Sequence, residues 1–206
     1  MRMLDLFCGR GGWTNAFLER GWECVGIDIN PQPDYRGEFI QDDVLSVTAK
    51  FVQGFDFACA SSPCEEFSVY GMRHFHPNPK FPDMGLALFC WTRRLLDNAK
   101  VPYVMENVRP AERFVGRAAH HCGPFYVWGN GVPVLMAQGI KKGLDMGSSA
   151  YAKGLRGKEL HDYRRQFTDM WAGSNSPQRK KATARVAMIP PELANCVAEY
   201  AERICK

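Results

Sequence analysis

The stretch MLDLFCGRGG, residues 3–12, decides the fold class, because it joins a short apolar run to a turn rich in glycine. The apolar run over residues 2–7 predicts a buried strand, and the glycines allow the backbone to turn sharply beside a ligand. A helix-like stretch follows over residues 13–20. A strand, a glycine-rich turn and a helix in this order predict the first unit of an α/β fold.

The rest of the chain continues this alternation. Five more strands are predicted from apolar runs, at residues 24–29, 38–41, 55–60, 101–108 and 123–128. Residues 84–99 carry apolar side chains at helical spacing, and a similar stripe after Pro191 predicts a C-terminal helix. Continuous apolar strands are typical of sheets that are covered on both faces, so we expect a mostly parallel sheet with flanking helices.

Composition indicates one globular domain. The chain has 206 residues, of which 46% are hydrophobic and 23% are charged. Its apolar runs are too short for a membrane-spanning helix, and Asp5 interrupts the region where a signal peptide would be apolar, so we expect no membrane partner. The eight cysteines, without a secretion signal, favour reduced thiols in a cytoplasm, most of them in the core.

Positive charge is concentrated in one segment. Residues 141–185 carry a net charge of +7, whereas the residues before them carry −2 and those after them −1. A basic block of this kind is typical of a polyanion contact, although a solvated lysine-rich surface has the same composition. The candidate DNA-binding residues in it are Lys141, Lys142, Arg179, Lys180 and Lys181.

Polar features follow the first three predicted strands, at the edge where open α/β sheets bind ligands. The glycine turn could bring backbone N–H groups toward a carboxylate or phosphate. Asp28 could accept hydrogen bonds from ribose hydroxyls, and Asp43, or Asp42 in its place, could contact an adenine amino group. Together these features predict a site for a cofactor that contains a nucleoside, without identifying the cofactor.

A cysteine and a glutamate form the candidate catalytic pair. Cys64 follows Pro63 on a polar loop, where a core cysteine is not expected and a thiolate could act as a nucleophile. Glu106 closes an apolar strand, where partial desolvation would raise its pKa and suit it to proton donation. Adjacent parallel strands would place the two residues side by side.

Three motifs in register resemble the cytosine-5 DNA methyltransferase family: DLFCGRGG at 5–12, SPCEEFS at 62–68 and ENV at 106–108. They are similar to its S-adenosylmethionine, Pro-Cys nucleophile and Glu-Asn-Val motifs. The resemblance implies a Rossmann-like methyltransferase fold, S-adenosylmethionine as cofactor, DNA as partner, and the cytoplasm of a bacterium or phage-infected cell as location. The residues it implies for cofactor binding are Asp5, Phe7, Cys8, Gly9, Gly11, Gly12, Trp13, Asp28, Ile29, Asp43, Val44 and Pro63.

The resemblance also implies a mechanism. The Cys64 thiolate adds to carbon 6 of cytosine while Glu106 protonates or hydrogen-bonds ring nitrogen 3, and carbon 5 then attacks the sulfonium methyl. Loss of the carbon 5 proton and elimination of Cys64 restore aromaticity. In a duplex the target base must first leave the stack.

We expect three parts along the chain: a catalytic and cofactor-binding core at 1–128, a reduced, basic target-recognition segment at 129–185, and a C-terminal helix at 186–206 that packs back on the core. The chain departs from the family's pattern at Ser62 and Glu65, where the family usually has Pro and Gln, and in lacking a clear Gln-x-Arg-x-Arg motif. The basic segment 141–185 is also far shorter than a recognition region of the family, and a surface that neutralises phosphates with few base contacts predicts a very short or degenerate target context, unless a protein partner supplies specificity.

Three alternatives stay open. The same chemistry could methylate RNA or a free cytosine nucleotide. A nicotinamide-dependent oxidoreductase would share the glycine turn but would leave the cysteine and glutamate pair unexplained. A non-catalytic nucleic-acid-binding module could hold zinc at Cys59, Cys64, His74 and His76, although this spacing matches no common zinc finger, so we expect no metal.

Overall fold

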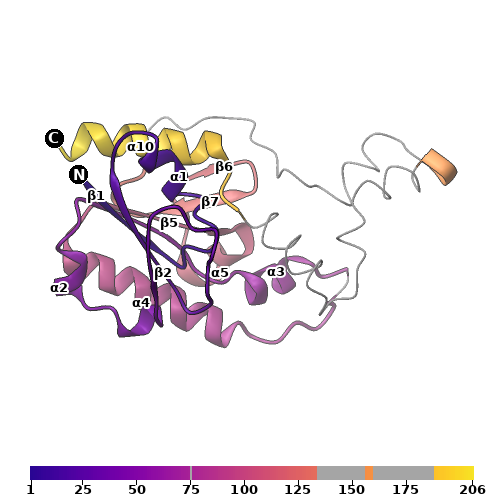
Figure 1. Cartoon of the computed structure of the whole chain (residues 1–206). Helices are drawn as coiled ribbons and strands as arrows, with labels where there is room; N and C mark the ends of the chain where they lie inside the picture. The colour runs from indigo at the N-terminus through magenta and orange to yellow at the C-terminus, as the bar shows by residue number, and fades with distance from the viewer. Residues whose placement is uncertain (75, 134–155, 160–187) are drawn as a thin grey trace. The chain divides into compact units, whose positions relative to one another are not determined.

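A computed structural model of the chain describes residues 1–74, 76–133, 156–159 and 188–206 (Figure 1). The chain divides into two units, Met1–Ile140 with Ile189–Lys206, and Lys141–Met188. Every element described below belongs to the first unit. Most of the expected recognition segment lies outside the described residues, as do its candidate DNA-binding residues Lys141, Lys142, Arg179, Lys180 and Lys181.

Seven strands within the described residues form one sheet in the order β3-β2-β1-β4-β5-β7-β6. Their bounds are Arg2–Leu6 (β1), Glu23–Asp28 (β2), Glu38–Gln41 (β3), Phe57–Ser61 (β4), Tyr103–Val108 (β5), His120–Cys122 (β6) and Phe125–Trp128 (β7). The first five run parallel, and β7 lies antiparallel between β5 and β6. The mostly parallel sheet predicted from the apolar runs is therefore confirmed.

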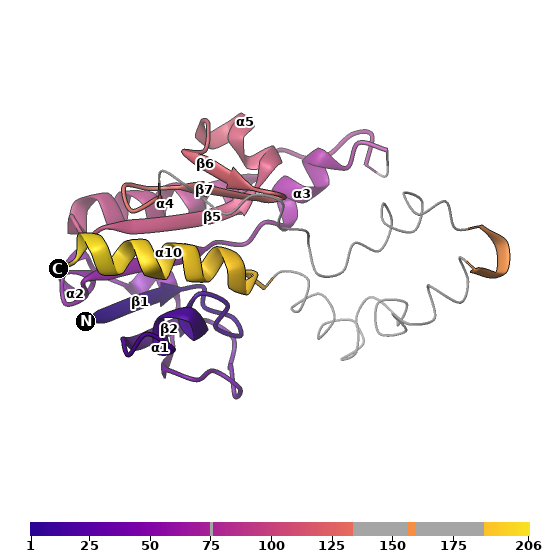
Figure 2. The same ribbon diagram turned by 90° about the horizontal axis from the view of Figure 1, so that it is seen from above.

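Helices cover both faces of the sheet. Their bounds are Thr14–Leu18 (α1), Ala49–Val52 (α2), Glu65–Gly71 (α3), Asp83–Ala99 (α4), Glu112–Val115 (α5) and Pro191–Ile204 (α10), with short 3-10 helices at Val44–Ser46 (η1) and Arg109–Ala111 (η2). Figures 1 and 2 show α10 beside α1 on one face and α4 on the opposite face. The last helix begins at Pro191 as predicted, because the fixed φ of proline suits a first helical turn.

Alternation along the buried strands divides their side chains between two apolar clusters. Met3, Phe57 and Val104 pack on the face covered by α1 and α10. Leu4 and Met105 pack on the face covered by α4. Burial of each large apolar side chain contributes roughly 1.5–3 kcal/mol, so the two clusters hold the strands in one register.

Several predicted boundaries are wrong. The strands expected over 55–60 and 101–108 begin two residues later, at Phe57 and Tyr103. The strand expected over 123–128 begins at Phe125, because Gly123 adopts φ +57° in the turn that joins β6 to β7. The helix expected over 13–20 ends at Leu18, and Gly21 turns the chain toward β2 at φ +77°. Both glycines supply a left-handed conformation that other residues rarely adopt.

The cysteines are less uniformly buried than the sequence predicts. Cys8, Cys24, Cys59 and Cys122 lie in the core, but Cys90 is exposed on α4, because this amphipathic helix turns one flank to solvent. Within the described residues, no helix has the length and apolar character needed to cross a membrane.

Candidate active site

The carboxyl ends of the parallel strands meet at one edge of the sheet. Strand β4 pairs directly with β5, and Ser61 lies opposite Glu106 in the register. Cys64 follows three residues after Ser61, at the start of α3. The candidate nucleophile and the candidate acid therefore lie at the ends of neighbouring strands, and both are half-buried.

The loop that carries Cys64 is held by Asn107. This fully buried side chain donates through Nδ2 to the carbonyl oxygen of Ser62 at 3.0 Å and to its Oγ at 3.2 Å. Its Oδ1 accepts from the backbone N–H of Val108 at 2.8 Å. Because a buried polar group without a partner costs about 1–3 kcal/mol, these bonds strongly favour one position of the loop. The sequence motif contains Asn107, but pattern alone did not assign it this contact.

Helix α3 is tied to α4 by a second polar contact. The backbone N–H of Gly85 donates to Oε2 of Glu66 at 2.5 Å. A Cβ on Gly85 would lie 3.1 Å from the same oxygen, so the small residue allows the close approach. Glu66 therefore anchors the helix that begins at the nucleophile, whereas Glu65 beside it is exposed.

The glycine turn after β1 is strained and clamped. Gly9 and Gly11 adopt φ +46° and +77°, and Phe7 adopts φ +56°, a left-handed conformation that costs a non-glycine residue roughly 1–2 kcal/mol. The backbone N–H of Gly9 donates to Oδ2 of Asp28 at 3.0 Å, and that of Asn30 donates to Oδ1 at 2.9 Å. Each carboxylate oxygen has two lone pairs, so Asp28 can still accept from ribose hydroxyls.

The two acids after β3 differ in their hydrogen bonds. Asp42 uses both carboxylate oxygens within the turn, accepting from the N–H of Asp43 at 2.7 Å and from the hydroxyl of Ser46 at 2.9 Å. Asp43 caps η1 through Oδ1, which accepts from the N–H of Leu45 at 2.9 Å. Asp43 therefore keeps more acceptor capacity for a ligand than Asp42 does.

The other residues expected to bind the cofactor differ in how far they are exposed to solvent. Ile29 is 62% exposed, Pro63 is exposed, and Gly12 is half-buried. Cys8, Trp13 and Val44 are buried, so their side chains pack within the protein. The Nε1–H of Trp13 donates to Oγ of Ser61 at 3.0 Å, which joins the glycine turn to the end of β4.

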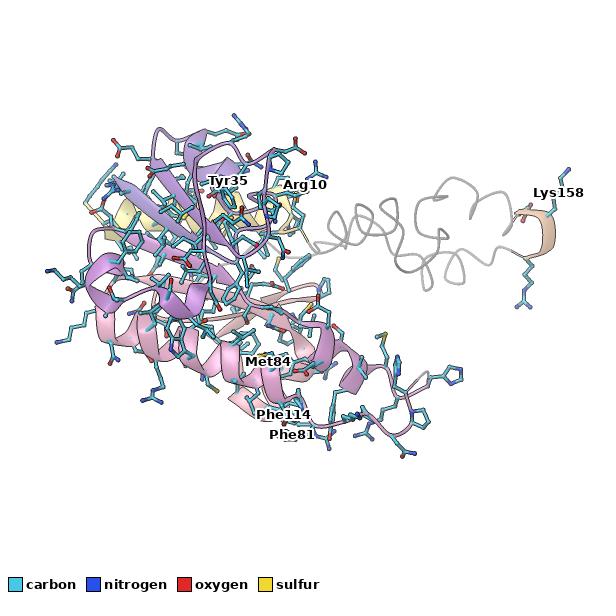
Figure 3. All side chains as sticks on the ribbon, turned by 60° about the horizontal axis from the view of Figure 1, so that its bottom comes forward. Arg10, Tyr35, Phe81, Met84, Phe114 and Lys158 are labelled. Carbon is cyan, nitrogen blue, oxygen red and sulfur yellow. The ribbon has the colours of Figure 1, made fainter. Side chains whose placement is uncertain are left out.

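A buried polar cluster lies beneath the turn. The Thr14 hydroxyl donates to Oδ2 of Asp5 at 2.8 Å and lies 2.5 Å from the Tyr35 hydroxyl. Tyr35 packs against Gly11 and Gly26, and a Cβ on Gly26 would clash with its ring (Figure 3). Oδ1 of Asp5 is buried and has no hydrogen-bond partner among the described residues. Pattern analysis missed Tyr35, because the residues it contacts are distant in sequence.

Three other thiols near the turn are more deeply buried than Cys64. Desolvation, with added repulsion from Asp5, raises the pKa of the Cys8, Cys24 and Cys59 thiols above their ordinary value. These thiols therefore stay protonated at neutral pH and are poor nucleophiles.

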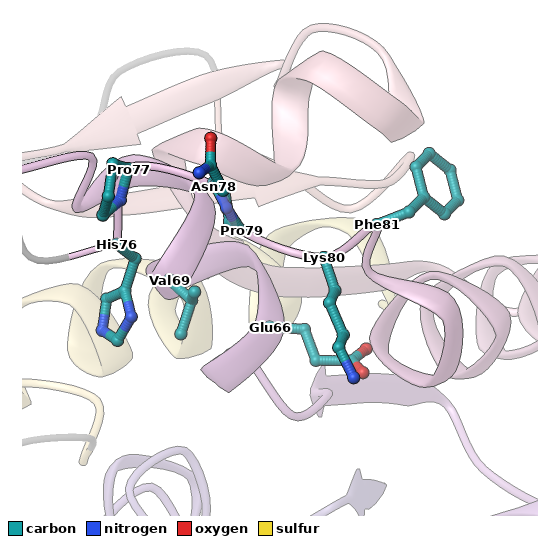
Figure 4. Close-up of a pocket in the computed structure, with 8 residues that line it drawn as sticks. All are labelled: Glu66, Val69, His76, Pro77, Asn78, Pro79, Lys80 and Phe81. Carbon is teal, nitrogen blue, oxygen red and sulfur yellow. The ribbon is translucent and has the colours of Figure 1, made fainter.

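A hollow of about 460 Å³ lies beside α3 and the segment that follows it (Figure 4). Its lining residues are Glu66, Val69, His76, Pro77, Asn78, Pro79, Lys80 and Phe81. Residues 72–82 contain two cationic side chains, Arg73 and Lys80, and no acidic residue. The exposed ring of Phe81 contacts Phe114 edge to face (Figure 3). Strand and helix periodicity does not single out this cationic segment, although its charge and its position after the nucleophile motif can be read from the sequence.

No group of three or more His, Cys, Asp or Glu side chains within the described residues is placed to hold a metal ion. The zinc site considered at Cys59, Cys64, His74 and His76 is therefore not assembled. Cys59 lies fully buried within β4, whereas His74 is exposed.

Residues 1–113 match the family model of the C-5 cytosine-specific DNA methylases, which is more than half of the chain. The chain belongs to this family. The family resemblance stated from the three motifs is confirmed, and membership disfavours the nicotinamide-dependent alternative, which would leave the cysteine and glutamate motifs without a role.

Two curated relatives each match about half of the chain. The chain is 34% identical over 116 residues to the type II methyltransferase M.HhaI of Haemophilus parahaemolyticus, covering 53% of this chain and 34% of the relative. It is 30% identical over 114 residues to the type II methyltransferase M.MspI of Moraxella sp, covering 52% and 26%. The chain thus spans about a third or less of the length of these relatives.

A solved methyltransferase structure is similar in fold to this chain. The Entamoeba histolytica methyltransferase EhMeth matches with a TM-score of 0.60 and 12% identity, covering 100% of this chain and 99% of that one. The likeness supports the fold alone, and with the strand order it confirms the expected Rossmann-like methyltransferase architecture.

The carboxyl of Asp5 makes stability depend on pH. Burial raises its pKa from 3.8 to about 8, hydrogen bonds from Thr14 oppose this shift, and the charge of Asp28 adds to it. Between these values the folded chain keeps a proton that the unfolded chain loses. The free energy of unfolding should therefore fall as pH rises from about 4 to 8, by at most about 1.4 kcal/mol per pH unit from this group.

Asp5→Asn keeps a neutral side chain of the same size and should flatten this slope. Urea denaturation at several pH values between 5 and 8 measures it. Asp34→Asn, at an exposed carboxyl paired with Arg10, is the control and should keep the wild-type slope. An unchanged slope in Asp5→Asn would contradict the assignment of the proton to Asp5.

Proposed function

We propose that this protein transfers a methyl group from S-adenosylmethionine to carbon 5 of cytosine in DNA through a covalent cysteine adduct. The observation that carries the proposal is the juxtaposition of Cys64 and Glu106 at the ends of two paired strands. Family membership supports it, because the matched residues 1–113 include all three motifs. The curated relatives are named type II methyltransferases, and the same chemistry is proposed here for a shorter chain.

The residues at the glycine turn fit the proposed cofactor. The left-handed turn brings backbone close to a ligand, and Asp28 keeps lone pairs for two ribose hydroxyls. The exposed side chain of Ile29 offers an apolar surface beside it, and Asp43 offers a carboxylate oxygen for an amino group. When bound, S-adenosylmethionine supplies an electrophilic methyl group.

In the proposed reaction, Cys64 adds its thiolate to carbon 6 of the base. Glu106 protonates or hydrogen-bonds ring nitrogen 3, which takes up the charge that the addition places on the ring, and the enamine formed by this addition makes carbon 5 nucleophilic. Asn107 holds the nucleophile loop against β5, so the position of Cys64 relative to Glu106 depends on this contact. After carbon 5 has taken the methyl group, it loses its proton and the bond to Cys64 breaks.

We also propose a DNA contact beside the nucleophile. Arg73 and Lys80 lie in the segment after α3, with His74 and His76 between them, and all follow Cys64 closely in sequence. Cationic side chains there could bind phosphates next to an extruded base. We propose the basic segment 129–185 as a second DNA contact. In the sequence it follows the catalytic core at 1–128 and precedes the C-terminal helix at 186–206.

A protein that grips phosphate and reads few base edges discriminates weakly between sequences. We therefore propose a short or degenerate cytosine context, unless a partner protein supplies specificity. We place this activity in the cytoplasm of a bacterium or a phage-infected cell.

The proposed activity is tested by transfer of tritium from the labelled methyl group of S-adenosylmethionine to duplex DNA, single-stranded DNA, RNA and dCMP. Wild-type protein should label DNA best. Cys64→Ser should abolish transfer and the covalent adduct with DNA that contains 5-fluorocytosine, because the hydroxyl is a far weaker nucleophile. Cys90→Ser, at an exposed thiol on α4, is the matched control and should retain activity. Transfer to dCMP alone would refute DNA as substrate, and an adduct that survives Cys64→Ser would refute the nucleophile.

The cofactor site is tested at Asp28. Asp28→Ala removes the acceptor for ribose hydroxyls and the clamp on Gly9, so cofactor affinity should fall by about 1–3 kcal/mol, measured by calorimetry. Glu23→Ala changes an exposed acid at the other end of the same strand and should leave affinity near wild type. Equal affinities for both variants would argue against Asp28 as a cofactor ligand.

Charge reversal tests the DNA contact. Arg73→Glu with Lys80→Glu should weaken binding to all DNA sequences about equally and should lower the slope of affinity against salt by about 2, one for each lost phosphate contact. Lys50→Glu, on α2 at the opposite edge of the sheet, provides the control. Affinity is measured by titration at several salt concentrations. The same slope for the double variant and for Lys50→Glu would rule out this segment as a DNA contact.

A further inference from the structure

One hydrogen bond joins the glycine turn to the nucleophile loop. Trp13 directly follows the turn, its ring is 1% exposed, and its Nε1–H donates to Oγ of Ser61 at 3.0 Å. Ser61 is the last residue of β4, lies opposite Glu106, and precedes Cys64 by three residues. A single hydroxyl thus connects the segment expected to hold the cofactor with the segment expected to hold the base.

A second tryptophan is buried in the same apolar cluster, and its indole N–H makes no comparable hydrogen bond within the part of the chain that the structure describes. Trp22 lies in the same apolar cluster, is 2% exposed, and packs edge to face on Phe17 with ring centroids 5.0 Å apart. Its Nε1–H has no hydrogen-bond partner among the described residues. The cluster accommodates an indole without a partner, so the bond of Trp13 is a specific link between two loops.

We propose that Trp13 and Ser61 are positioning residues that set the distance between the two halves of the active site. The inference rests on the proposed function. Each half has its own anchor, since Asp28 clamps Gly9 to the end of β2 and Asn107 fixes the nucleophile loop to β5. The bond between Trp13 and Ser61 joins these two anchored loops to each other.

Only one step of the reaction needs both halves in register. Cofactor binding depends on the glycine turn, and addition of Cys64 to the base depends on the loop and Glu106. Methyl transfer requires carbon 5 and the methyl carbon to approach within roughly 3–3.5 Å in line, and a displacement of about 1 Å can slow such a step on the order of 100-fold. Loss of the link should therefore slow transfer selectively.

The test compares Trp13→Phe, Ser61→Ala and the double variant with Trp22→Phe as the matched control. Three quantities are measured: single-turnover methyl transfer to DNA, affinity for S-adenosylhomocysteine, and release of tritium from carbon 5 of cytosine without cofactor. Tritium release reports addition of Cys64 to carbon 6, protonation of carbon 5 from solvent, loss of the triton and elimination of Cys64. It thus follows the nucleophile half alone.

We expect each single variant to transfer methyl about 10–100-fold more slowly, with tritium release within about threefold of wild type and, for Ser61→Ala, affinity within about threefold as well. The double variant should be no slower than either single one, because both remove the same bond. Trp22→Phe should match wild type in all three measurements.

Two outcomes would overturn the inference: unchanged transfer in the single variants, or a parallel fall in all three quantities, which would give the bond a general structural role. Failure of the proposed function is seen separately, as a wild-type protein that neither releases tritium nor transfers methyl. Ser61→Ala leaves the buried N–H of Trp13 without an acceptor, which lowers the stability of the chain and can obscure an effect on transfer. Trp13→Phe removes that donor and keeps an aromatic ring, so it decides the question in that case.

Discussion

The parallel pairing of β4 with β5, in the register that sets Ser61 opposite Glu106, is the constraint on which the rest of the site depends. Parallel strands end at the same edge, so the loop that leaves β4 and the last residues of β5 must meet there. A slip of one residue would turn Glu106 to the other face of the sheet. The two apolar clusters oppose such a slip, because it would move the core side chains of β5 to the wrong face as well.

Register brings the loops together, and side-chain hydrogen bonds then hold them. Asn107 to Ser62 and Trp13 to Ser61 are buried or half-buried contacts, where a broken bond leaves a polar group away from water. The same low polarity keeps Asp5 protonated beneath the turn. These buried contacts therefore favour one arrangement of the loops, and they also make that arrangement sensitive to single substitutions.

Periodicity and strand-end chemistry predicted the fold class and the pairing of the strand before Cys64 with the strand that carries Glu106, because apolar runs define strands and parallel strands share an edge. They could not predict Tyr35 beneath the glycine turn or the hydroxyl of Ser61 as an acceptor. Those contacts join residues far apart in sequence through side-chain geometry, which leaves no periodic pattern. The start of β7 was missed for a local reason, since Gly123 supplies a turn inside an apolar run.

Ser62 shows how the chain keeps its nucleophile loop rigid with one proline fewer than is usual in the family. A proline restricts φ and lowers the entropy of the unfolded chain. Serine gives up that restriction, but its hydroxyl accepts an additional hydrogen bond from Asn107 that a proline could not accept, which stabilises the folded loop directly. Pro63 still fixes the residue before Cys64. The position of Cys64 thus depends more on its contacts with β5 than it would with a proline at position 62. The residue that makes this contact, Asn107, belongs to the same motif as Glu106.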